Sequence, residues 1–381
     1  MSRTLKICLT TLAPFIGGAE VAVERLALGL QELGHQVFLV VGKSGEVMER
    51  LQGVGLRCIF SPMCFTDKWH MWRYRSARRA LQNILLSEQP DVVHSNDLPT
   101  HQIVSDAALR VRIPRICHHR FPFGTAAIDW LNKYGAERHL FVSQALMTEM
   151  CQQSTCLDAS ARAVVYDGLP MPDLPTEATR QQARSQLGLP SEKVIVTFAG
   201  QLIERKGVAD LLQAWSRLKP PIQHHAELVL VGDDLQGKGQ YRVAMQQFAN
   251  HLQCGARFVG FQKNVGEWLT ASDIAVVPSH VEPLGNATLE AMSYVLPVIG
   301  CAVGGIPEMV VHEHTGLLVP AHNPEQLAQA LTRLLSEQTT RLSYGLQARK
   351  RCEQLFSIQT HVHNVVQEYN KVSIDIRSRR A

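Results

Sequence analysis

Short apolar runs alternate with amphipathic ones along the start of the chain. Residues 5–12 are mostly apolar and read as a buried strand, Gly17-Gly18 predicts a turn, and apolar residues then recur at helical spacing. Gly34 ends that helix, and a second apolar run at 36–41 follows at once. A strand, a helix and a strand in this order predict a βαβ unit, whose strands are parallel and whose crossover is right-handed. The pattern therefore predicts an α/β fold class.

The same pattern continues and divides the chain in two. Apolar runs predict further strands of the first sheet at 91–94, 114–117, 140–143 and 163–166. Three prolines (170, 172 and 175) stop both helix and strand, so a linker is expected at 167–175. Beyond it the rhythm restarts, with strands predicted at 193–199, 228–231, 257–261, 274–278, 297–299 and 317–319, and helices at 208–218, 324–337, 341–354 and 359–371.

These elements predict two Rossmann-like parallel-sheet domains with expected bounds of 1–170 and 171–357. A C-terminal helix at 358–381 is expected to pack back on the first domain. Two such domains should face each other across a cleft at the carboxyl ends of both sheets, which is where ligands of these folds bind.

Composition and charge exclude several classes of protein. Of 381 residues, 45% are hydrophobic and 19% are charged, which provides for sizeable cores and excludes a disordered chain. The net charge of +4 is too small for a dedicated nucleic-acid binder. Nine cysteines without a Cys-x-x-Cys pair favour buried thiols in a reducing compartment, and no apolar run is long enough to span a membrane. We therefore expect a cytoplasmic protein without a nucleic-acid partner.

Two glycine-containing loops are candidates for binding an anion. Gly17-Gly18, before the first helix, would let backbone amides approach a ligand, although a tight turn without a ligand explains two glycines equally well. The loop 200–207 opens the second domain, and its Arg205 and Lys206 could neutralise a diphosphate. The alternative for these two residues is a pair of solvated loop cations.

The third and strongest motif covers residues 278–308. Glu282 follows a predicted strand, and the loop Leu284-Gly285-Asn286 leads into a helix predicted at 287–294, with Asn286 as its N-cap. Glu290 lies in the first turns of that helix. The amides of this loop would form an anion cradle with one carboxylate on each side, which suits hydroxyl-rich groups such as a sugar and a ribose.

Taken in this order, the motifs resemble those of retaining glycosyltransferases of the GT-B architecture, specifically glycosyltransferase family 4. The similarity covers nearly the whole chain, through Gly17-Gly18, Asp167-Gly168, 200–207, the pair Glu282 and Glu290, and Gly304-Gly305-Ile306-Pro307-Glu308. It implies transfer of a sugar from a nucleoside-diphosphate sugar to a glycan or glycolipid acceptor, with retention at the anomeric carbon and without a cofactor or metal ion. The first domain would bind the acceptor and the second the nucleotide sugar. Cell-surface polysaccharide or lipopolysaccharide biosynthesis is the commonest setting of similar chains and is expected here.

The resemblance also implies a role for each motif residue. Glu282 would hold hydroxyls of the transferred sugar, and Lys206 would stabilise the leaving diphosphate. The remaining donor contacts would be Gly17, Gly18, the amides of Leu284, Gly285 and Asn286 at the sugar and phosphates, and Glu290 at the nucleotide ribose.

The sequence departs from the family pattern at one position in the loop 200–207 and at one position in the linker. Gln201 stands where members usually carry Arg, so one phosphate cation is missing from its expected place, and Arg205 is the candidate substitute. Asp167 stands where Asn is common before the glycine, and a structural turn is expected there in either case.

A third departure concerns a histidine of the first domain. Members of the family usually carry it a few residues after the proline that begins one of the strands. Here Pro114 is followed by His118, His119 and Arg120, and Arg120 occupies the usual position of that histidine. We expect this cluster to contact the sugar or the acceptor, with His119 favoured for a polar contact at the catalytic site.

Some other features have an ordinary explanation beside a functional one. Asn96-Asp97 and the acidic pair Asp233-Asp234 are typical turn formers after strands, and His312 and His314 flank a turn, so no metal site is expected from them. Residues 68–79 carry Lys68, Trp69, Trp72, Tyr74 and four arginines without one acidic residue. This segment suits a peripheral contact with anionic lipid headgroups at the inner face of the cell membrane, or with a phosphorylated acceptor. An ordinary basic surface with its aromatic residues packed inward fits equally well.

Two other functions share much of this pattern. A nucleotide-sugar epimerase could have the same paired sheets. A non-catalytic binder of nucleotide sugars or glycans is conceivable because Gln201 replaces a cation, but the intact pair Glu282 and Glu290 argues against it.

Overall fold

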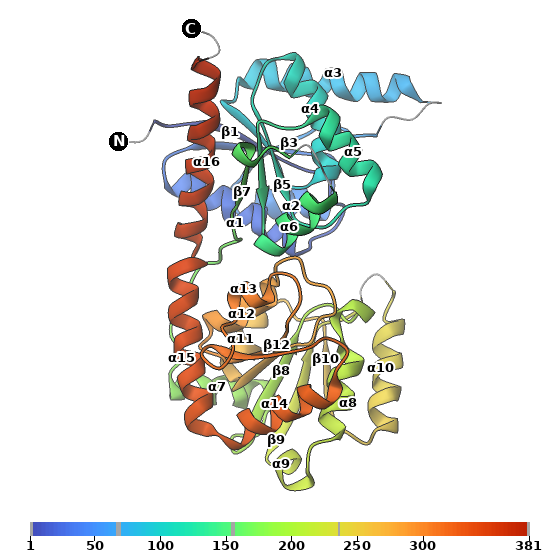
Figure 1. Cartoon of the computed structure of the whole chain (residues 1–381), viewed down its shortest axis with the longest axis vertical. Coiled ribbons are helices and arrows are strands. Elements are labelled where there is room, and N and C mark those ends of the chain that lie inside the picture. Colours follow the sequence, from blue (N-terminus) through green and yellow to red (C-terminus); the bar gives the residue numbers. More distant parts are fainter. Residues whose placement is uncertain (1–2, 66–69, 154–156, 235–236, 379–381) are drawn as a thin grey trace. The chain divides into compact units, whose positions relative to one another are not determined.

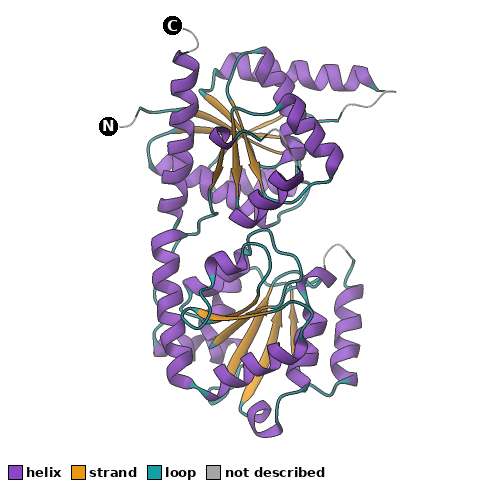
Figure 2. Ribbon diagram, in the orientation of Figure 1, coloured by secondary structure: helices purple, strands orange, loops and turns teal. Residues whose placement is uncertain are grey.

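The computed structural model of the chain describes residues 3–65, 70–153, 157–234 and 237–378 (Figure 1). The chain forms two compact units. The first comprises Met1–Pro170 together with Phe356–Ala381, and the second comprises Met171–Leu355. Helices cover both faces of the sheet in each unit (Figure 2). The predicted fold class, two parallel-sheet α/β domains, is confirmed.

The first unit is built on a parallel sheet with the strand order β3-β2-β1-β4-β5-β6-β7. Its strands are β1 (Lys6–Thr11), β2 (Gln36–Val41), β3 (Arg57–Phe60), β4 (Val92–Ser95), β5 (Arg115–His119), β6 (Arg138–Phe141) and β7 (Arg162–Val164). The order reverses between β1 and β4, and such a switch point is where sheets of this kind bind ligands at their carboxyl ends. Strand β3 is absent from the predicted elements because it lies at the edge of the sheet, with Arg57 and Phe60 exposed.

Alternate residues of β1 join two different cores, which explains why its central residues Ile7, Cys8 and Leu9 are apolar without a break. Ile7 and Leu9 pack on one face, and Cys8 packs on the other. The helices of this unit are α1 (Gly18–Glu32), α2 (Glu46–Gly53), α3 (Met71–Glu88), α4 (Leu98–Arg110), α5 (Thr125–Tyr134), α6 (Gln144–Gln153) and α16 (Ile358–Ser378), with a short 3-10 turn at Ala159–Ala161.

Helix α16 packs against α1 and belongs to the core of the first unit (Figure 1). Its Val362, Val365 and Tyr369 are buried with the apolar face of α1. Gly29 makes this approach feasible, because a Cβ atom there would lie 2.6 Å from Cγ2 of Val362.

The second unit has a parallel sheet with the order β10-β9-β8-β11-β12-β13. Its strands are β8 (Val194–Ala199), β9 (Ala226–Val231), β10 (Arg257–Gly260), β11 (Ile274–Val277), β12 (Val298–Cys301) and β13 (Gly316–Val319). Its helices are α7 (Glu177–Leu187), the 3-10 turn η2 (Glu204–Lys206), α8 (Val208–Ser216), α9 (Pro220–His224), α10 (Gln240–His251), α11 (Val265–Ala271), α12 (Asn286–Ser293), α13 (Ile306–Met309), α14 (Pro324–Ser336) and α15 (Gln338–Leu355). None of the helices described in either unit is long and apolar enough to span a lipid bilayer.

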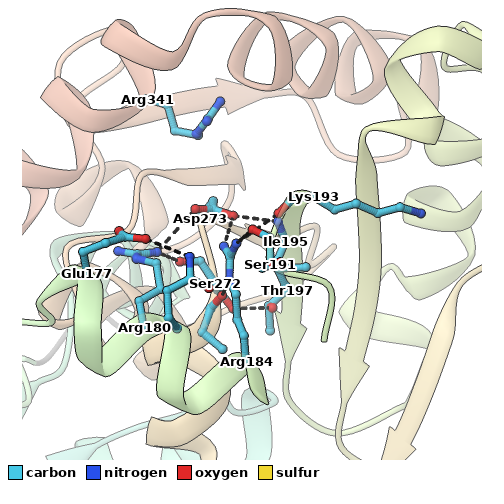
Figure 3. Close-up of polar contacts among 12 residues, drawn as sticks. Glu177, Arg180, Arg184, Ser191, Lys193, Ile195, Thr197, Ser272, Asp273 and Arg341 are labelled. Atoms are coloured by element: carbon cyan, nitrogen blue, oxygen red, sulfur yellow. Dashed lines mark hydrogen bonds and ion pairs between the residues drawn. The ribbon is translucent and has the colours of Figure 1, made fainter. Parts of the chain in front are cut away.

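A polar network ties α7 to the amino ends of β8 and β11 (Figure 3). The carboxylate of Asp273 accepts hydrogen bonds from the Arg184 guanidinium at 2.6 Å and from the Ile195 amide at 2.7 Å. Arg184 is 4% exposed and also donates to the carbonyls of Ala271 and Ser191. This network lies at the end of the sheet away from the strands' carboxyl ends, so we assign it to stability.

We expect Asp273→Ala to lower the free energy of unfolding of the second unit by about 3 kcal/mol, because it leaves the buried Arg184 charge and the Ile195 amide without their acceptor. Urea denaturation of the full chain, compared with an exposed control variant such as Glu192→Ala, measures the difference. A loss no larger than that of the control would contradict the assignment.

Candidate active site

Lys206 and Glu282 form an ion pair at the carboxyl end of the second sheet. Lys206 ends the turn η2 after β8, and Glu282 lies in the loop after β11. The Lys206 Nζ contacts Oε2 of Glu282, which also accepts a hydrogen bond from the Ser279 hydroxyl at 3.1 Å. The Glu282 residue is 8% exposed. A cation and a carboxylate predicted to serve one reaction are therefore in direct contact.

Gly207 allows the two loops to come together. Its φ angle of 67° lies in the left-handed region, and a Cβ atom there would overlap the carbonyl oxygen of Pro278. The His280 amide donates to the Arg205 carbonyl at 2.8 Å and completes the contact between the loops. The side chain of Arg205 itself is exposed, with Nη1 3.5 Å from the carbonyl of Val281.

Gly304 and Gly305 pack closely against the loop that carries Glu282. The Gly305 amide donates to the Glu282 carbonyl at 3.1 Å, and a Cβ atom on Gly304 would overlap that same carbonyl. A Cβ atom on Gly305 would lie 2.8 Å from the Cα of Leu284. The sequence motif contains this glycine pair but does not indicate its role. In the structure, the two glycines allow the loop after β12 to pack on residues 282–284.

Helix α12 begins at Asn286, and its N-cap is Gly285. The prediction of Asn286 as the N-cap is therefore wrong by one residue. Gly285 has a φ angle of 106°, which is unfavourable for other residues, so the sharp turn into the helix falls there. The amides of the first turn and the helix dipole still present partial positive charge beside Leu284 and Glu282. Glu290 lies half-buried in the following turn of the same helix.

Gly17 and Gly18 lie at the start of α1 in the first unit, with Gly17 as the N-cap. The Gly17 amide donates to Oε2 of Glu20 at 3.0 Å. Burial raises the pKa of this carboxyl, and the bond to the amide opposes the shift. In the structure the amide predicted to meet a donor phosphate therefore has an acceptor from its own helix.

His118 and His119 lie in the core of the first unit, with no exposed surface. The Nε2 of His119 is 3.1 Å from Nδ1 of His139, and its ring stacks on Phe141 with centroids 4.6 Å apart. His118 points to the other face of the sheet, where its ring stacks on that of His94. Both residues belong to β5, whose two faces are covered, so neither side chain has exposed surface for a sugar or an acceptor here, and their contact with either one stays a prediction.

Arg120 follows directly after β5 and forms a buried ion pair with Asp167. Its Nη1 lies 2.6 Å from both carboxylate oxygens of Asp167, and its Nε donates to Oδ1 of Asn96 at 2.7 Å. The two residues are each 4% exposed. They are separated by 47 positions, so the sequence alone does not reveal the pair.

The segment 68–79 divides between the surface and the interior of the first unit. Lys68 and Trp69 lie outside the described residues. Trp72 is 65% exposed and its indole faces the Arg73 guanidinium, whereas Tyr74 and Arg78 both donate to Asp106 of α4 at 3.1 Å. An acidic partner that is distant in sequence therefore neutralises part of this basic segment.

Two family models together match most of the chain. Residues 16–169 match the model described as Glycosyltransferase Family 4, and residues 179–351 match the one described as Glycosyl transferases group 1. The chain belongs to glycosyltransferase family 4.

Similar proteins match this glycosyltransferase over most of its length. An uncharacterized glycosyltransferase of Methanocaldococcus jannaschii is 27% identical over 348 residues, which cover 84% of this chain and 86% of that protein. The alpha-maltose-1-phosphate synthase of Mycolicibacterium smegmatis is 29% identical over 323 residues, covering 75% and 80% respectively. Among solved structures, Anabaena HepE in complex with UDP-glucose matches with a TM-score of 0.84 at 20% identity, over 96% of this chain and 100% of that one. The predicted GT-B architecture is confirmed.

In this glycosyltransferase, two departures from the family pattern compensate each other. The resemblance implies a histidine where this chain has Arg120 and an asparagine where it has Asp167, and the structure joins these two residues in one ion pair. A charge introduced at one position is thus balanced by a charge at the other.

A double-mutant cycle tests this compensation. We expect Asp167→Asn or Arg120→His alone to lower the free energy of unfolding of the first unit by about 3 kcal/mol or more, because each leaves one buried charge unpaired. The double variant should lose clearly less than the sum of the two, in urea denaturation at neutral pH. Additive losses would show that the pair has no coupling of its own.

Proposed function

We propose that this glycosyltransferase transfers a sugar from a nucleoside-diphosphate sugar to a glycan or glycolipid acceptor, with retention of the anomeric configuration and without a metal ion in the transfer step. The contact between Lys206 and Glu282 beside the start of α12 carries the proposal. It places a cation, a carboxylate and the amino end of a helix at the carboxyl edge of one parallel sheet. The fold shared with HepE, which was crystallised with UDP-glucose, supports a donor of this class.

The chemistry needed is stabilisation of the departing nucleoside diphosphate while positive charge builds at the anomeric carbon. The ammonium group of Lys206 and the amides at the start of α12 are fixed dipoles and charges aimed at an anion, which need no reorganisation during the reaction. Arg205, exposed at the same turn, can add a second cation. These groups supply the positive charge that a metal ion would supply in another enzyme.

The two carboxylates of the second unit have separate proposed tasks. Glu282, held by Lys206 and Ser279, accepts hydrogen bonds from hydroxyls of the transferred sugar, and Glu290 accepts them from the nucleotide ribose. The motifs provide charge stabilisation and no obvious nucleophile for a covalent intermediate. This favours departure and attack on the same face of the sugar, and hence retention.

A panel of UDP-, GDP- and ADP-sugars, followed by NMR, tests the proposal. We expect consumption of one donor class and release or transfer of the sugar with the donor's anomeric configuration. Formation of an epimerised nucleotide sugar without acceptor would instead identify an epimerase. Nucleotide binding without consumption of any donor would identify a non-catalytic binder.

We also propose that the exposed part of α3 contacts anionic lipid, in keeping with a glycolipid acceptor and a role in cell-surface polysaccharide or lipopolysaccharide biosynthesis at the inner face of the membrane. Trp72 and Met71 expose apolar area beside Arg73, Arg75 and Arg79 on the first turns of the helix.

Co-sedimentation with vesicles of phosphatidylglycerol, but not phosphatidylcholine, is the expected result. A Trp72→Ala, Arg73→Glu variant should sediment less, whereas Arg217→Glu on the second unit serves as the control. Equal sedimentation of both variants would refute the contact.

A further inference from the structure

Three side chains of the second unit that are able to ligate a metal ion lie close together, and none of them is assigned to donor binding. Asp210 lies in the first turn of α8, His280 in the loop after β11, and His322 between β13 and α14. They come from one helix start and two loops, each of which follows the carboxyl end of a strand of the same sheet. None of them belongs to the acidic pairs or to the His312 and His314 turn that the sequence draws attention to.

The ligand atoms of the three residues lie close together. Nε2 of His280 is 2.8 Å from Oδ2 of Asp210, and one ligand atom from each of the three residues lies within 4.8 Å of the others. The imidazole rings of His280 and His322 have centroids only 3.6 Å apart, at an angle of 34°. Aromatic pairs usually keep their centroids about 4.5–7 Å apart, so the two rings are in unusually close contact.

The exposure of these three side chains differs in a way that suits a binding site open on one side. The side chains of Asp210 and His280 are 17% and 15% exposed, and His322 is exposed. The backbone amide of His280 donates a hydrogen bond to the Arg205 carbonyl, and Gly207 leaves room for the imidazole, since a Cβ atom there would come 3.1 Å from Nε2 of His280. Two of the three side chains are thus mostly covered, and the third lies at the surface.

We propose that Asp210, His280 and His322 bind a divalent transition-metal ion of the Zn²⁺, Co²⁺ or Ni²⁺ type. Two imidazoles and one carboxylate form a donor set that these ions prefer, whereas Mg²⁺ and Ca²⁺ prefer sites made of oxygen alone. Three protein ligands leave further positions of the ion for water. The ion takes no part in the transfer step, for which no metal is proposed.

The site would connect the two loops that carry the Lys206 and Glu282 pair. Asp210 lies four residues after Lys206, and His280 lies two residues before Glu282. A bound ion would therefore restrain the distance between these loops. This consequence rests on the proposed function, but binding of the ion does not.

Titration of the chelator-treated full-length protein with Co²⁺ tests the site directly. We expect visible absorption bands of protein-bound Co²⁺ that Zn²⁺ abolishes and Mg²⁺ does not. His322→Ala, which changes an exposed residue, and His280→Ala should each weaken Co²⁺ binding by about tenfold or more, whereas His314→Ala, an exposed histidine of the same unit, should leave it unchanged. Zn²⁺ should also raise the thermal denaturation midpoint of the wild type and not of His322→Ala.

Co²⁺ binding that persists unchanged in both variants, or no bands up to about 1 mM Co²⁺, would overturn the proposal and leave a hydrogen-bonded His280 and Asp210 pair with a stacked ring. Donor consumption measured on the same chelator-treated protein separates the two proposals. Binding of Co²⁺ without sugar transfer would refute only the proposed function, and transfer without Co²⁺ binding would refute only the metal site.

Discussion

The Lys206→Ala variant is expected to transfer sugar about a hundredfold more slowly than the wild type, or slower still, which is the scale of losing one preorganised group that stabilises a developing negative charge. The substitution removes the ammonium group that contacts Glu282 and that we assign to the leaving diphosphate. Glu290→Ala should cause a loss of the same order through the ribose. Turnover numbers from donor consumption at saturating donor give the comparison.

Two controls separate this effect from damage to the fold. Lys219→Ala removes an exposed lysine from the same unit and should leave turnover unchanged. Urea denaturation of Lys206→Ala shows whether leaving the 8% exposed Glu282 without its partner destabilises the unit at the assay temperature. Near-wild-type turnover in both Lys206→Ala and Glu290→Ala would defeat the assignment of these residues.

The first unit is expected to lose most of its stability between pH 7 and pH 5. Burial lowers the pKa of His94 to about 3, that of His101 to about 4 and that of His139 to about 3, from an ordinary value of 6.5. Burial also lowers the pKa values of His118, His119 and His361. These imidazoles stay neutral in the fold, whereas the unfolded chain binds protons below about pH 6.5.

The sign follows from this difference in bound protons. The unfolded state gains protons that the folded state does not, so stability is full above about pH 6.5 and falls as the pH drops toward the lowered pKa values. At pH 5 each such histidine costs about 2 kcal/mol, and several together exceed the net stability of about 5–15 kcal/mol that domains usually have.

Hydrogen exchange at pH 7 and pH 5, after correction for the intrinsic pH dependence, locates the effect. Peptides from β4, β5 and β6 should lose protection, and peptides from β8 and β11 should keep it, since the histidines named above all belong to the first unit. His118→Leu should reduce the pH dependence, because both nitrogens of that buried ring have no hydrogen-bond partner within the described residues. Equal loss of protection in both units would contradict this explanation.

The sequence predicts the architecture well because buried parallel strands are apolar on both faces. Ile7, Cys8 and Leu9 read as one continuous run, and each faces a helix layer. Strand β3 escapes prediction because an edge strand does not need that pattern, and Arg57 can lie in it. The other edge strands, β7, β10 and β13, contain no exposed residue and overlap predicted strands, so it is the exposure of its residues that hides β3.

The candidate site is predicted unevenly for a related reason. Lys206 and Glu282 belong to loops at the ends of neighbouring strands, so the order of elements brings them to one edge. The histidines of β5 are polar residues in a covered strand, and sequence spacing does not show which positions the helices cover. The partners Arg120 and Asp167, like Asp210, His280 and His322, meet only through tertiary contacts between distant segments.

The contribution of α16 to the first unit affects when that unit can complete its folding during translation. A ribosome completes all of 171–355 before it adds Val362, Val365 and Tyr369, so the nascent first unit waits with the apolar side of α1 uncovered while the second unit can already fold. A stop codon shortly after position 355 would therefore damage the unit encoded at the opposite end of the gene and spare the one beside it. Chaperone dependence during translation should concentrate in that interval.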